Sequence, residues 1–378
     1  MDLRKLVDKI KPTFEKGGKL GFLHSTFDAF ETFLFVPNTV TKKGAHVSDC
    51  VDLKRVMIMV VLALVPAMLF GIWNVGYQHS EAFGLNWNFW QIVGHGLIKV
   101  LPLYIVAYLV GLAIEFVSAQ IKGHEVNEGY LVSGMLIPLI VPVDVPLWML
   151  AIAVAFAVII GKEVFGGTGM NIWNPALLTR AFLFFSYPAS MSGDKVWVSG
   201  MSAVDGMTGA TPLADASAAG LEKAGYSICD LIVGTTPGSV GETSVIAILL
   251  GAALLLWTGV ASWKIMVSSV LGGLAIGYIG YAAGSTDLPG YYQLLMGGFL
   301  FGTVFMATDP VTSAQTETGK WIYGFLIGAL AVVVRLWNPG YPEGMMLAIL
   351  LMNTFAPLID HYVIECSIKR RMKKVKTA

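Results

Sequence analysis

Charged residues are scarce in this chain. Only 13% of its 378 residues are Asp, Glu, Lys or Arg, whereas 55% are apolar and the mean hydropathy is +0.68. Soluble domains carry about 25% charged residues. The 25 basic and 25 acidic residues cancel, so net charge does not favour binding to a nucleic acid. The composition therefore predicts an all-α, polytopic protein embedded in a lipid bilayer.

Metal-binding side chains are also few. Cys50, Cys229 and Cys366 lie far apart in the sequence, and the six histidines show no ligand spacing. These features argue against a zinc site or an iron–sulfur cluster held by this chain alone. The first residues carry charges and no apolar run, so we expect no cleavable signal peptide. No nucleotide-binding motif is visible, so a nucleotide site would have to lie on another polypeptide.

Long apolar runs dominate what is present. Some are too short to cross about 30 Å of hydrocarbon as straight helices, namely 129–142, 146–160, 175–188 and 293–307. We expect partial or broken helices there, buried in the bundle, because irregular backbone at membrane depth usually lines a site. Together the runs predict about ten helices, at 56–74, 97–118, 129–142, 146–160, 175–188, 244–260, 264–283, 293–307, 321–336 and 343–360.

Basic residues are distributed unevenly between the two sides that these runs define. Most lie in residues 1–55, in the tail from 369 to 376, and in alternate loops at Lys122, Lys162, Lys264 and Lys320. The other side has only Lys195 and Lys223, while Lys99, Arg180 and Arg335 fall within the runs. The positive-inside rule then puts both termini in the cytoplasm and the loop 189–243 in the periplasm.

Two stretches of the sequence echo each other. IWNPA (Ile172–Ala176) reappears as LWNPG (Leu336–Gly340), 164 positions later. SGMLIPLIVPVD, ending at Asp144, resembles GGFLFGTVFMATD, ending at Asp309, 165 positions later. Each unit would hold five spans, so the two halves would have inverted topology. Inversion places Asp144 and Asp309 on opposite faces, an arrangement typical of a pathway through a membrane.

A polar stretch outside the apolar runs carries the motif DGMTGAT, from Asp205 to Thr211. Glycines at 206 and 209 let the backbone fold closely around a bulky group, and Thr211 supplies a hydroxyl oxygen. Thr208 offers a competing hydroxyl. The spacing alone is equally compatible with an exposed Asp-Gly turn in a connecting loop.

The motif resembles the flavinylation sequence Asp-x-x-Ser/Thr-Gly-Ala-Thr, whose last threonine carries FMN through a phosphoester bond. Three further stretches resemble the B-subunit family of sodium-translocating NADH:quinone oxidoreductases: VDLKRVMIMV (Val51–Val60), FGGTGMNIWNPAL (Phe165–Leu177) and FMATDPVT (Phe305–Thr312). The matches extend from about residue 50 to the C-terminal tail. The related RnfD protein of Rnf-type complexes shares the membrane core but typically lacks the long charged region before Val56.

The resemblance implies a complex of several subunits in the bacterial inner membrane, which passes electrons from NADH to ubiquinone and exports Na⁺. It implies covalent FMN on Thr211, within a motif that includes Asp205 and Gly209, and a separate flavin transferase that attaches it. It also implies riboflavin contact at Asn171 and Asn174. Helix capping ahead of a proline accounts well for Asn174 without a ligand.

Carboxylates within or beside the apolar runs are candidates for a Na⁺ pathway. Glu115, in the second run, is costly to bury and offers the oxygen ligands that hard cations prefer. Its alternative role is that of an interfacial residue beside Lys122. Asp309 and Asp360, at the ends of the eighth and tenth runs, are further candidates, with turn formation and the water boundary as their alternatives. The resemblance supports Glu115 and places Gly111 close to the quinone.

These inferences predict a cytoplasmic N-terminal region, a first membrane repeat, a periplasmic flavin-bearing loop, a second membrane repeat and a basic cytoplasmic tail, at 1–55, 56–188, 189–243, 244–360 and 361–378. The leading hypothesis is a subunit of a redox-driven sodium pump. An RnfD-type protein, serving ferredoxin and NAD, is the alternative within the superfamily. A flavin-free channel of urea-transporter-like architecture is the alternative from another class, and it has no need of DGMTGAT.

Overall fold

Helices form all of the regular secondary structure in the described part of the chain. The computed structural model describes residues 3–14, 21, 24, 27, 31, 35, 43–45, 53–122, 129–201, 209–219, 226–338 and 343–377. In chain order the elements are α1 (Leu3–Phe14), α3 (Leu53–Ala82), α4 (Phe89–Lys122), α5 (Tyr130–Ile140), α6 (Leu147–Val158), the π-helix η2 (Ile159–Glu163), α7 (Pro175–Ser186), α8 (Pro188–Met191), α9 (Pro212–Ala219), α11 (Ile228–Val233), α12 (Val245–Trp257), α13 (Trp263–Ala282), α14 (Tyr292–Leu295), α15 (Phe299–Phe301), the π-helix η4 (Gly302–Met306), α16 (Glu317–Trp337) and α17 (Met345–Thr377).

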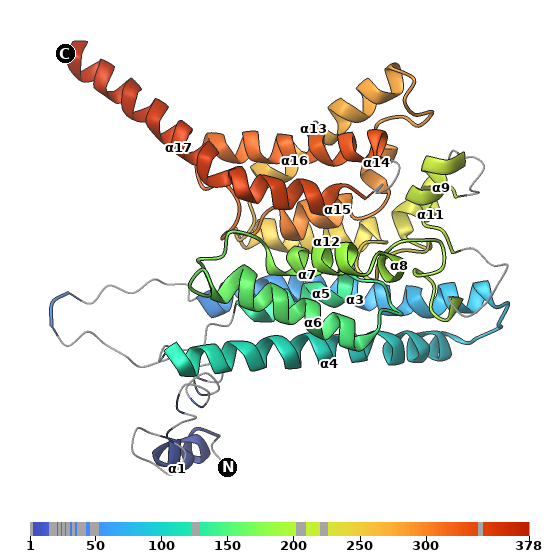
Figure 1. Cartoon of the computed structure of the whole chain (residues 1–378), viewed down its shortest axis with the longest axis horizontal. Coiled ribbons are helices and arrows are strands. Elements are labelled where there is room, and N and C mark those ends of the chain that lie inside the picture. The colour runs from blue at the N-terminus through green and yellow to red at the C-terminus, as the bar shows by residue number, and fades with distance from the viewer. Residues whose placement is uncertain are drawn as a thin grey trace.

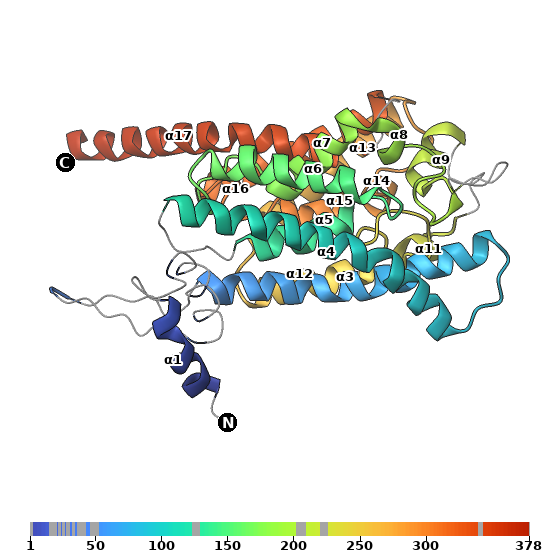
Figure 2. The same ribbon diagram turned by 60° about the horizontal axis from the view of Figure 1, so that its bottom comes forward.

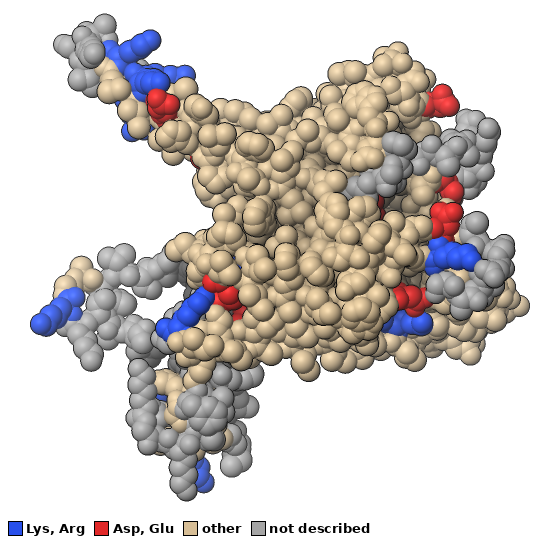
Figure 3. Space-filling view, viewed as in Figure 1, with Lys and Arg blue, Asp and Glu red and all other residues tan. Residues whose placement is uncertain are grey.

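Five of the described helices are long and apolar enough to cross a membrane: Arg55–Ala82, Phe89–Lys122, Trp263–Ala282, Glu317–Trp337 and Met345–Lys373. Large apolar side chains such as Ile98, Leu109 and Leu250 remain exposed on the outside of the bundle. Figure 3 shows a broad face without charged side chains between charged groups at the two ends. An apolar belt of this kind suits lipid, so the chain is a polytopic membrane protein, as predicted.

The short apolar runs form short or interrupted helices, as expected. α5 has 11 residues and α7 has 12, which at about 1.5 Å per residue is too little for the hydrocarbon core. α6 continues directly as the π-helix η2. The run 293–307 is broken where α14 ends, because Gly297 takes a φ of 61° before α15 begins. The number of spans and the inverted repeat stay predictions.

Several helices differ in length from the sequence prediction. α3 and α4 have 30 and 34 residues and extend well beyond the predicted runs 56–74 and 97–118. α12 has only 13 residues, because the Thr258 hydroxyl donates to the Leu254 carbonyl oxygen at 2.9 Å and Gly259 takes a φ of 71°, which turns the chain out of the helix. α17 is longer than predicted and continues past residue 360 to Thr377. The tail 361–377 is therefore helical.

The two parts of the chain share one core. Figure 1 shows α3 to α7 in one part of the bundle and α13, α16 and α17 in the other, with α12 between them. α12 packs against α3, and α17 packs against α7. Buried side chains from both parts, among them Leu136, Phe301 and Ile349, form a continuous cluster. Figure 2 shows that α9 and the C-terminal turns of α17 lie at opposite ends of the bundle.

The pairing of α13 with α16 depends on glycines. A Cβ atom at Gly328 would overlap the carbonyl oxygen of Ser269, and one at Gly272 would overlap that of Phe325. Small residues permit such close approach of backbones in a membrane, where van der Waals packing rather than the hydrophobic effect holds helices together.

We expect the substitution Gly328→Leu to force α13 and α16 apart and to lower the melting temperature of the protein in detergent. Overpacking of this kind typically costs about 1–3 kcal/mol. Gly94→Leu is the control, because no atom lies within 4 Å of a Cβ added there. Melting followed by near-UV circular dichroism measures the difference, and equal melting temperatures for the two variants would contradict the prediction.

Candidate functional site

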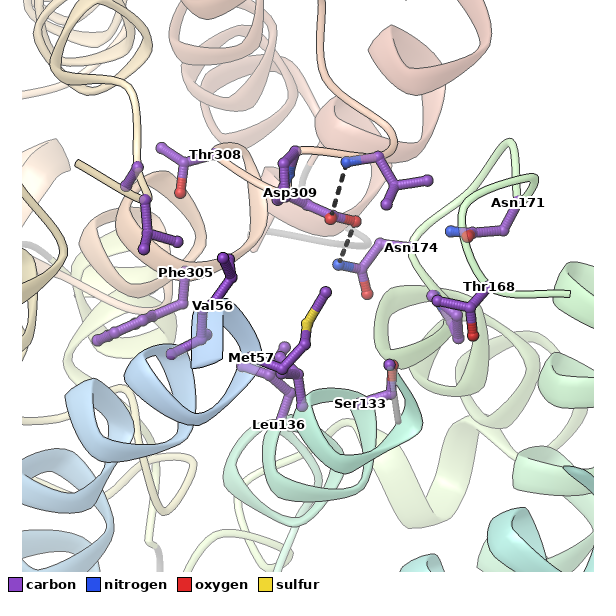
Figure 4. Close-up of a pocket in the computed structure, with 18 of the residues that line it drawn as sticks. Val56, Met57, Ser133, Leu136, Thr168, Asn171, Asn174, Phe305, Thr308 and Asp309 are labelled. Carbon is purple, nitrogen blue, oxygen red and sulfur yellow. Dashed lines mark hydrogen bonds between the residues drawn. The ribbon is translucent and has the colours of Figure 1, made fainter. Parts of the chain in front are cut away.

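A pocket opens between the two parts of the bundle, at the end from which α17 projects. It contains about 740 Å³ of space, part of which is open to solvent, and we call it the junction pocket. Val56 on α3 and Leu136 on α5 contribute apolar walls, whereas polar side chains reach it from the segment before α7 and the segment after η4 (Figure 4). Three residues predicted from the sequence meet there: Asn171, Asn174 and Asp309.

Asn174 links the start of α7 to Asp309. Its Oδ1 accepts the backbone N–H of Ala176 at 2.9 Å. Asn174 therefore caps α7, which is the role predicted for it in the absence of a ligand. Its Nδ2 faces Asp309 Oδ2 at 3.5 Å (Figure 4). Asp309 also accepts hydrogen bonds from the N–H of Val311 at 3.2 Å and the hydroxyl of Thr312 at 3.0 Å, which form the turn before α16. Both side chains therefore have structural partners and also line the pocket.

Asn171 reaches the junction pocket from a glycine-rich turn. Gly166 and Gly169 take φ angles of 122° and 89°, which lets the chain fold back between η2 and α7. Asn171 Nδ2 donates to the carbonyl oxygen of Trp173 at 3.1 Å. Trp173 Nε1 donates to Thr354 Oγ1 on α17 at 2.9 Å and so ties this turn to the second part of the bundle.

Glu115 is buried on α4, where it forms an ion pair with Lys162 on η2. The two side chains are only 4% and 3% exposed. The sequence predicts Lys162 in a loop, but η2 continues α6 and carries this lysine into the interior. Lys122, the expected partner of an interfacial Glu115, pairs instead with Glu163 at 2.9 Å.

Gly111 lies one helical turn before Glu115, against the ring of Tyr130. A Cβ atom at position 111 would overlap the ring carbon Cζ and the hydroxyl of Tyr130. That hydroxyl donates to the carbonyl oxygen of Ala107 at 2.8 Å, and Lys162 Nζ lies 5.9 Å from the centre of the same ring. Because Gly111 has no side chain, another group can approach the backbone closely there, and in this structure that group is the ring of Tyr130.

Asp360 is not among the residues that line the junction pocket. From α17 it accepts the backbone N–H of Gln315 at 2.7 Å and that of Thr316 at 2.9 Å. It thereby holds α17 against the start of α16, a structural task that requires no ion. Its place in a Na⁺ pathway stays a prediction.

The end of the DGMTGAT motif lies at the other end of the bundle, beside α9. The N–H of Gly209 donates to the carbonyl oxygen of Asp194 at 2.8 Å. The Oγ1 atom of the half-buried Thr211 accepts the N–H of Ala214 at 3.3 Å, as a residue that caps a helix does. Thr211 borders a second pocket of about 430 Å³, also partly open to solvent, which we call the α9 pocket. Asp205 lies outside the described residues.

Two stacked histidines hold the loop that packs against Gly209. The rings of His79 and His95 are 4.2 Å apart between centroids. His79 Nδ1 lies 2.7 Å from the carbonyl oxygen of Ser199, and His95 Nε2 lies 2.9 Å from its Oγ. Asp144 pairs with Lys99 at 2.9 Å and accepts a backbone N–H from the same loop. The loop around Ser199 and Gly200 is thus fixed to the ends of α3 and α4.

Buried charges gather beside the α9 pocket. Arg180 on α7 pairs with Glu242 at 2.8 Å and also with Glu343, and both glutamates line that pocket. Burial raises the pKa of Glu242 because its charged form loses hydration, Arg180 opposes that rise, and Glu343 adds to it.

A profile of the NQR2, RnfD, RnfE family matches residues 40–369 of the chain. The chain belongs to this family.

The relatives are similar to this member of the family along their whole length. The B subunits of the Na⁺-translocating NADH-quinone reductases from Pseudomonas paraeruginosa and Azotobacter vinelandii are each 46% identical over 405 aligned residues, covering 99% of the chain and 100% of the relative. The corresponding protein from Chromohalobacter salexigens is 45% identical over 402 residues, covering 99% and 97%. The resemblance seen in four short stretches is therefore confirmed.

Three charged partners in this family member, Glu242, Glu343 and Lys162, could not be identified from the sequence. Arg180 inside an apolar run signals an internal acid, but Glu242 and Glu343 are too far away in the sequence to be identified as its partners. Lys162 follows an apolar run directly and so resembles an interfacial lysine. Only the continuation of α6 into η2 shows that it is buried.

We expect Gly111→Ala to displace Tyr130 and weaken its hydrogen bond to Ala107, because the added methyl group overlaps the ring. The loss of stability should be about 1–3 kcal/mol, and part of it should return in the double variant Gly111→Ala/Tyr130→Leu. Thermal melting in detergent measures it. Gly94→Ala on the same helix is the matched control, and the prediction is wrong if the two alanine variants melt together.

Proposed function

We propose that the chain is the membrane subunit of a Na⁺-translocating NADH:ubiquinone reductase, that it carries FMN on Thr211, and that it passes electrons toward ubiquinone while Na⁺ is exported. The observation that carries this proposal is the position of Thr211. Its hydroxyl ends an intact DGMTGAT motif and borders the α9 pocket, in a chain whose full length is similar to B subunits of such reductases.

The backbone at Thr211 favours an esterified phosphate, whereas Asp215 in the first turn of α9 and the glutamates of the α9 pocket oppose one. The hydroxyl lies at the N-terminus of α9, where backbone N–H groups and the helix dipole favour negative charge. Pro212, at the first helical position, has no N–H that a phosphate would leave unsatisfied. When bound, the flavin ring supplies the redox chemistry, whereas the chain supplies position and electrostatics.

The junction pocket is suited to a second planar carrier. Like most small-molecule sites, it combines apolar walls with a few polar side chains that converge on one space. The amides of Asn171 and Asn174 can donate to and accept from the polar edge of a riboflavin or quinone ring, while the apolar walls cover its faces. Gly111 supports this pocket indirectly, since it makes room for Tyr130 beside Lys162.

Carboxylates near the same pocket provide an entry for Na⁺. Glu115 and Asp309 offer the oxygen atoms that a hard cation prefers, and Asp360 is a third candidate farther along. Each Na⁺ moved against 100 mV costs about 2.3 kcal/mol, so ion binding has to be tied to an electron-transfer step.

The positive-inside rule sets the sidedness of this proposal. Both termini face the cytoplasm of a bacterium across its inner membrane, so the junction pocket opens to the cytoplasm and Thr211 faces the periplasm. Ten spans in two inverted halves satisfy this orientation. The other subunits of the complex supply the NADH site, and a flavin transferase loads Thr211.

The similarities favour a quinone reductase over the two alternatives. The family description includes RnfD, but the three relatives named above are all B subunits of Na⁺-translocating NADH-quinone reductases. A flavin-free channel would have no use for the Thr211 motif.

Thr211→Ala should abolish covalent flavin on the chain, because it removes the oxygen that forms the ester. Flavin fluorescence of the chain in a denaturing gel, followed by mass spectrometry of its peptides, measures the attachment. Thr208→Ala is the matched control and should keep the flavin. Flavin retained at full occupancy in Thr211→Ala, or lost only in Thr208→Ala, would exclude Thr211 as the attachment site.

Asp309→Asn and Asp360→Asn should have different effects. Asp309 lines the junction pocket, so its amide variant should raise the Na⁺ concentration needed for half-maximal quinone reduction. Asp360 holds the start of α16, so its variant should mainly lower the melting temperature of the complex, by weakening hydrogen bonds to a charged group worth about 1.5–3 kcal/mol each. An unchanged Na⁺ requirement in Asp309→Asn would remove Asp309 from the pathway.

A further inference from the structure

The buried ammonium of Lys162 is left unexplained by the proposed function. Its side chain is 3% exposed, although a lysine at the end of an apolar run ordinarily extends its long stem to water. The π-helix η2 carries it inward instead. The other described π-helix, η4, supplies Phe305 to the junction pocket, which Lys162 also lines. π-Helical turns are frequent at functional sites.

Lys162 lies between a carboxylate and the junction pocket. Its Nζ donates a hydrogen bond to Glu115 Oε1 and lies 5.9 Å from the centre of the Tyr130 ring. The wall of the pocket that it lines also holds Asn174 and Asp309. Glu115 Oε2 has no hydrogen-bond partner within the described part of the chain. Glu115 therefore has one oxygen on the lysine and one that could contact a second cation.

Na⁺ and the Lys162 ammonium compete to neutralise the Glu115 carboxylate. A carboxylate taken out of water requires one compensating positive charge, and a second one would leave an uncompensated buried charge. Na⁺ and an ammonium group each supply one. The lysine side chain has a flexible four-carbon stem, so its ammonium group can leave without movement of the helix. Asp309 and the amide oxygens of the junction pocket can receive it.

We propose that Lys162 is a tethered counter-ion of Glu115, which Na⁺ displaces into the junction pocket. This rests on the proposed function, since it takes Glu115 as the carboxylate that accepts Na⁺. The exchange keeps the charge at Glu115 balanced, because one cation leaves as the other arrives. The junction pocket gains one positive charge for each Na⁺ bound, so Na⁺ occupancy changes the electrostatics of the site proposed for the electron carrier.

The test is the variant Lys162→Met in the assembled complex. Removal of the competing cation should lower the Na⁺ concentration for half-maximal quinone reduction about tenfold, a size usual for coupling between two ligands. The Na⁺ concentration that half-saturates the rise in melting temperature of the complex should fall equally, which reports binding without turnover. An unchanged or higher Na⁺ requirement in both measurements overturns the proposal.

Lys122→Met is the matched control, because it removes a lysine from the neighbouring, more exposed pair with Glu163. It should leave the Na⁺ requirement unchanged, and a fall as large as that of Lys162→Met would overturn a specific role for Lys162. Glu115→Gln distinguishes failure of the proposed ion site from failure of the Lys162 counter-ion. If it leaves the Na⁺ requirement unchanged, the proposed ion site itself fails. If it raises that requirement while Lys162→Met does not lower it, only the tethered counter-ion fails.

Lys162→Arg decides the case if the methionine variant does not assemble. A guanidinium group stays charged and can bind a carboxylate through two N–H groups, so it should compete more strongly and raise the Na⁺ requirement. An unchanged or lower requirement in this variant would overturn the proposal.

Discussion

A charge removed from water has to be paired, and this requirement determines where the polar groups of the bundle lie. Glu115 is paired with Lys162, and Arg180 lies between Glu242 and Glu343. Each pair joins elements that are distant in the sequence. An arrangement of the helices that separated a pair would leave a buried charge unpaired and would therefore be less stable. The lipid-facing surface between the two ends of the bundle is left to apolar side chains (Figure 3).

The buried polar and charged groups gather at two separate pockets. At one end, the Thr211 hydroxyl borders the α9 pocket, whose lining includes Trp197 of the loop that His79 and His95 contact. At the other, the junction pocket combines amides, a carboxylate and the Lys162 ammonium. The proposed function, in which electrons and Na⁺ both move through the membrane, requires sites near both faces. A lysine that exchanges with Na⁺ would make ion binding and the charge of the junction pocket parts of a single event.

Much of this arrangement could be predicted from local sequence. Apolar runs located the helices because burial of apolar surface does not depend on which neighbour provides it. Asn174 could be recognised as a cap from the proline that follows it, and the short runs 129–142 and 175–188 could be recognised as too short to span. The length of α12 could not be predicted as easily, since Thr258 and Gly259 end the helix inside what reads as one apolar run.

The sequence by itself determined that this chain is helical and lipid-embedded, and its short motifs were enough to indicate the family. These properties follow from composition, periodicity and contiguous residues. Only the tertiary structure decided that Asn171, Asn174 and Asp309 share one pocket and that Lys162 neutralises Glu115. The physical reason is that a pocket or a buried ion pair consists of distances between residues far apart along the chain, and the packing of the helices sets those distances.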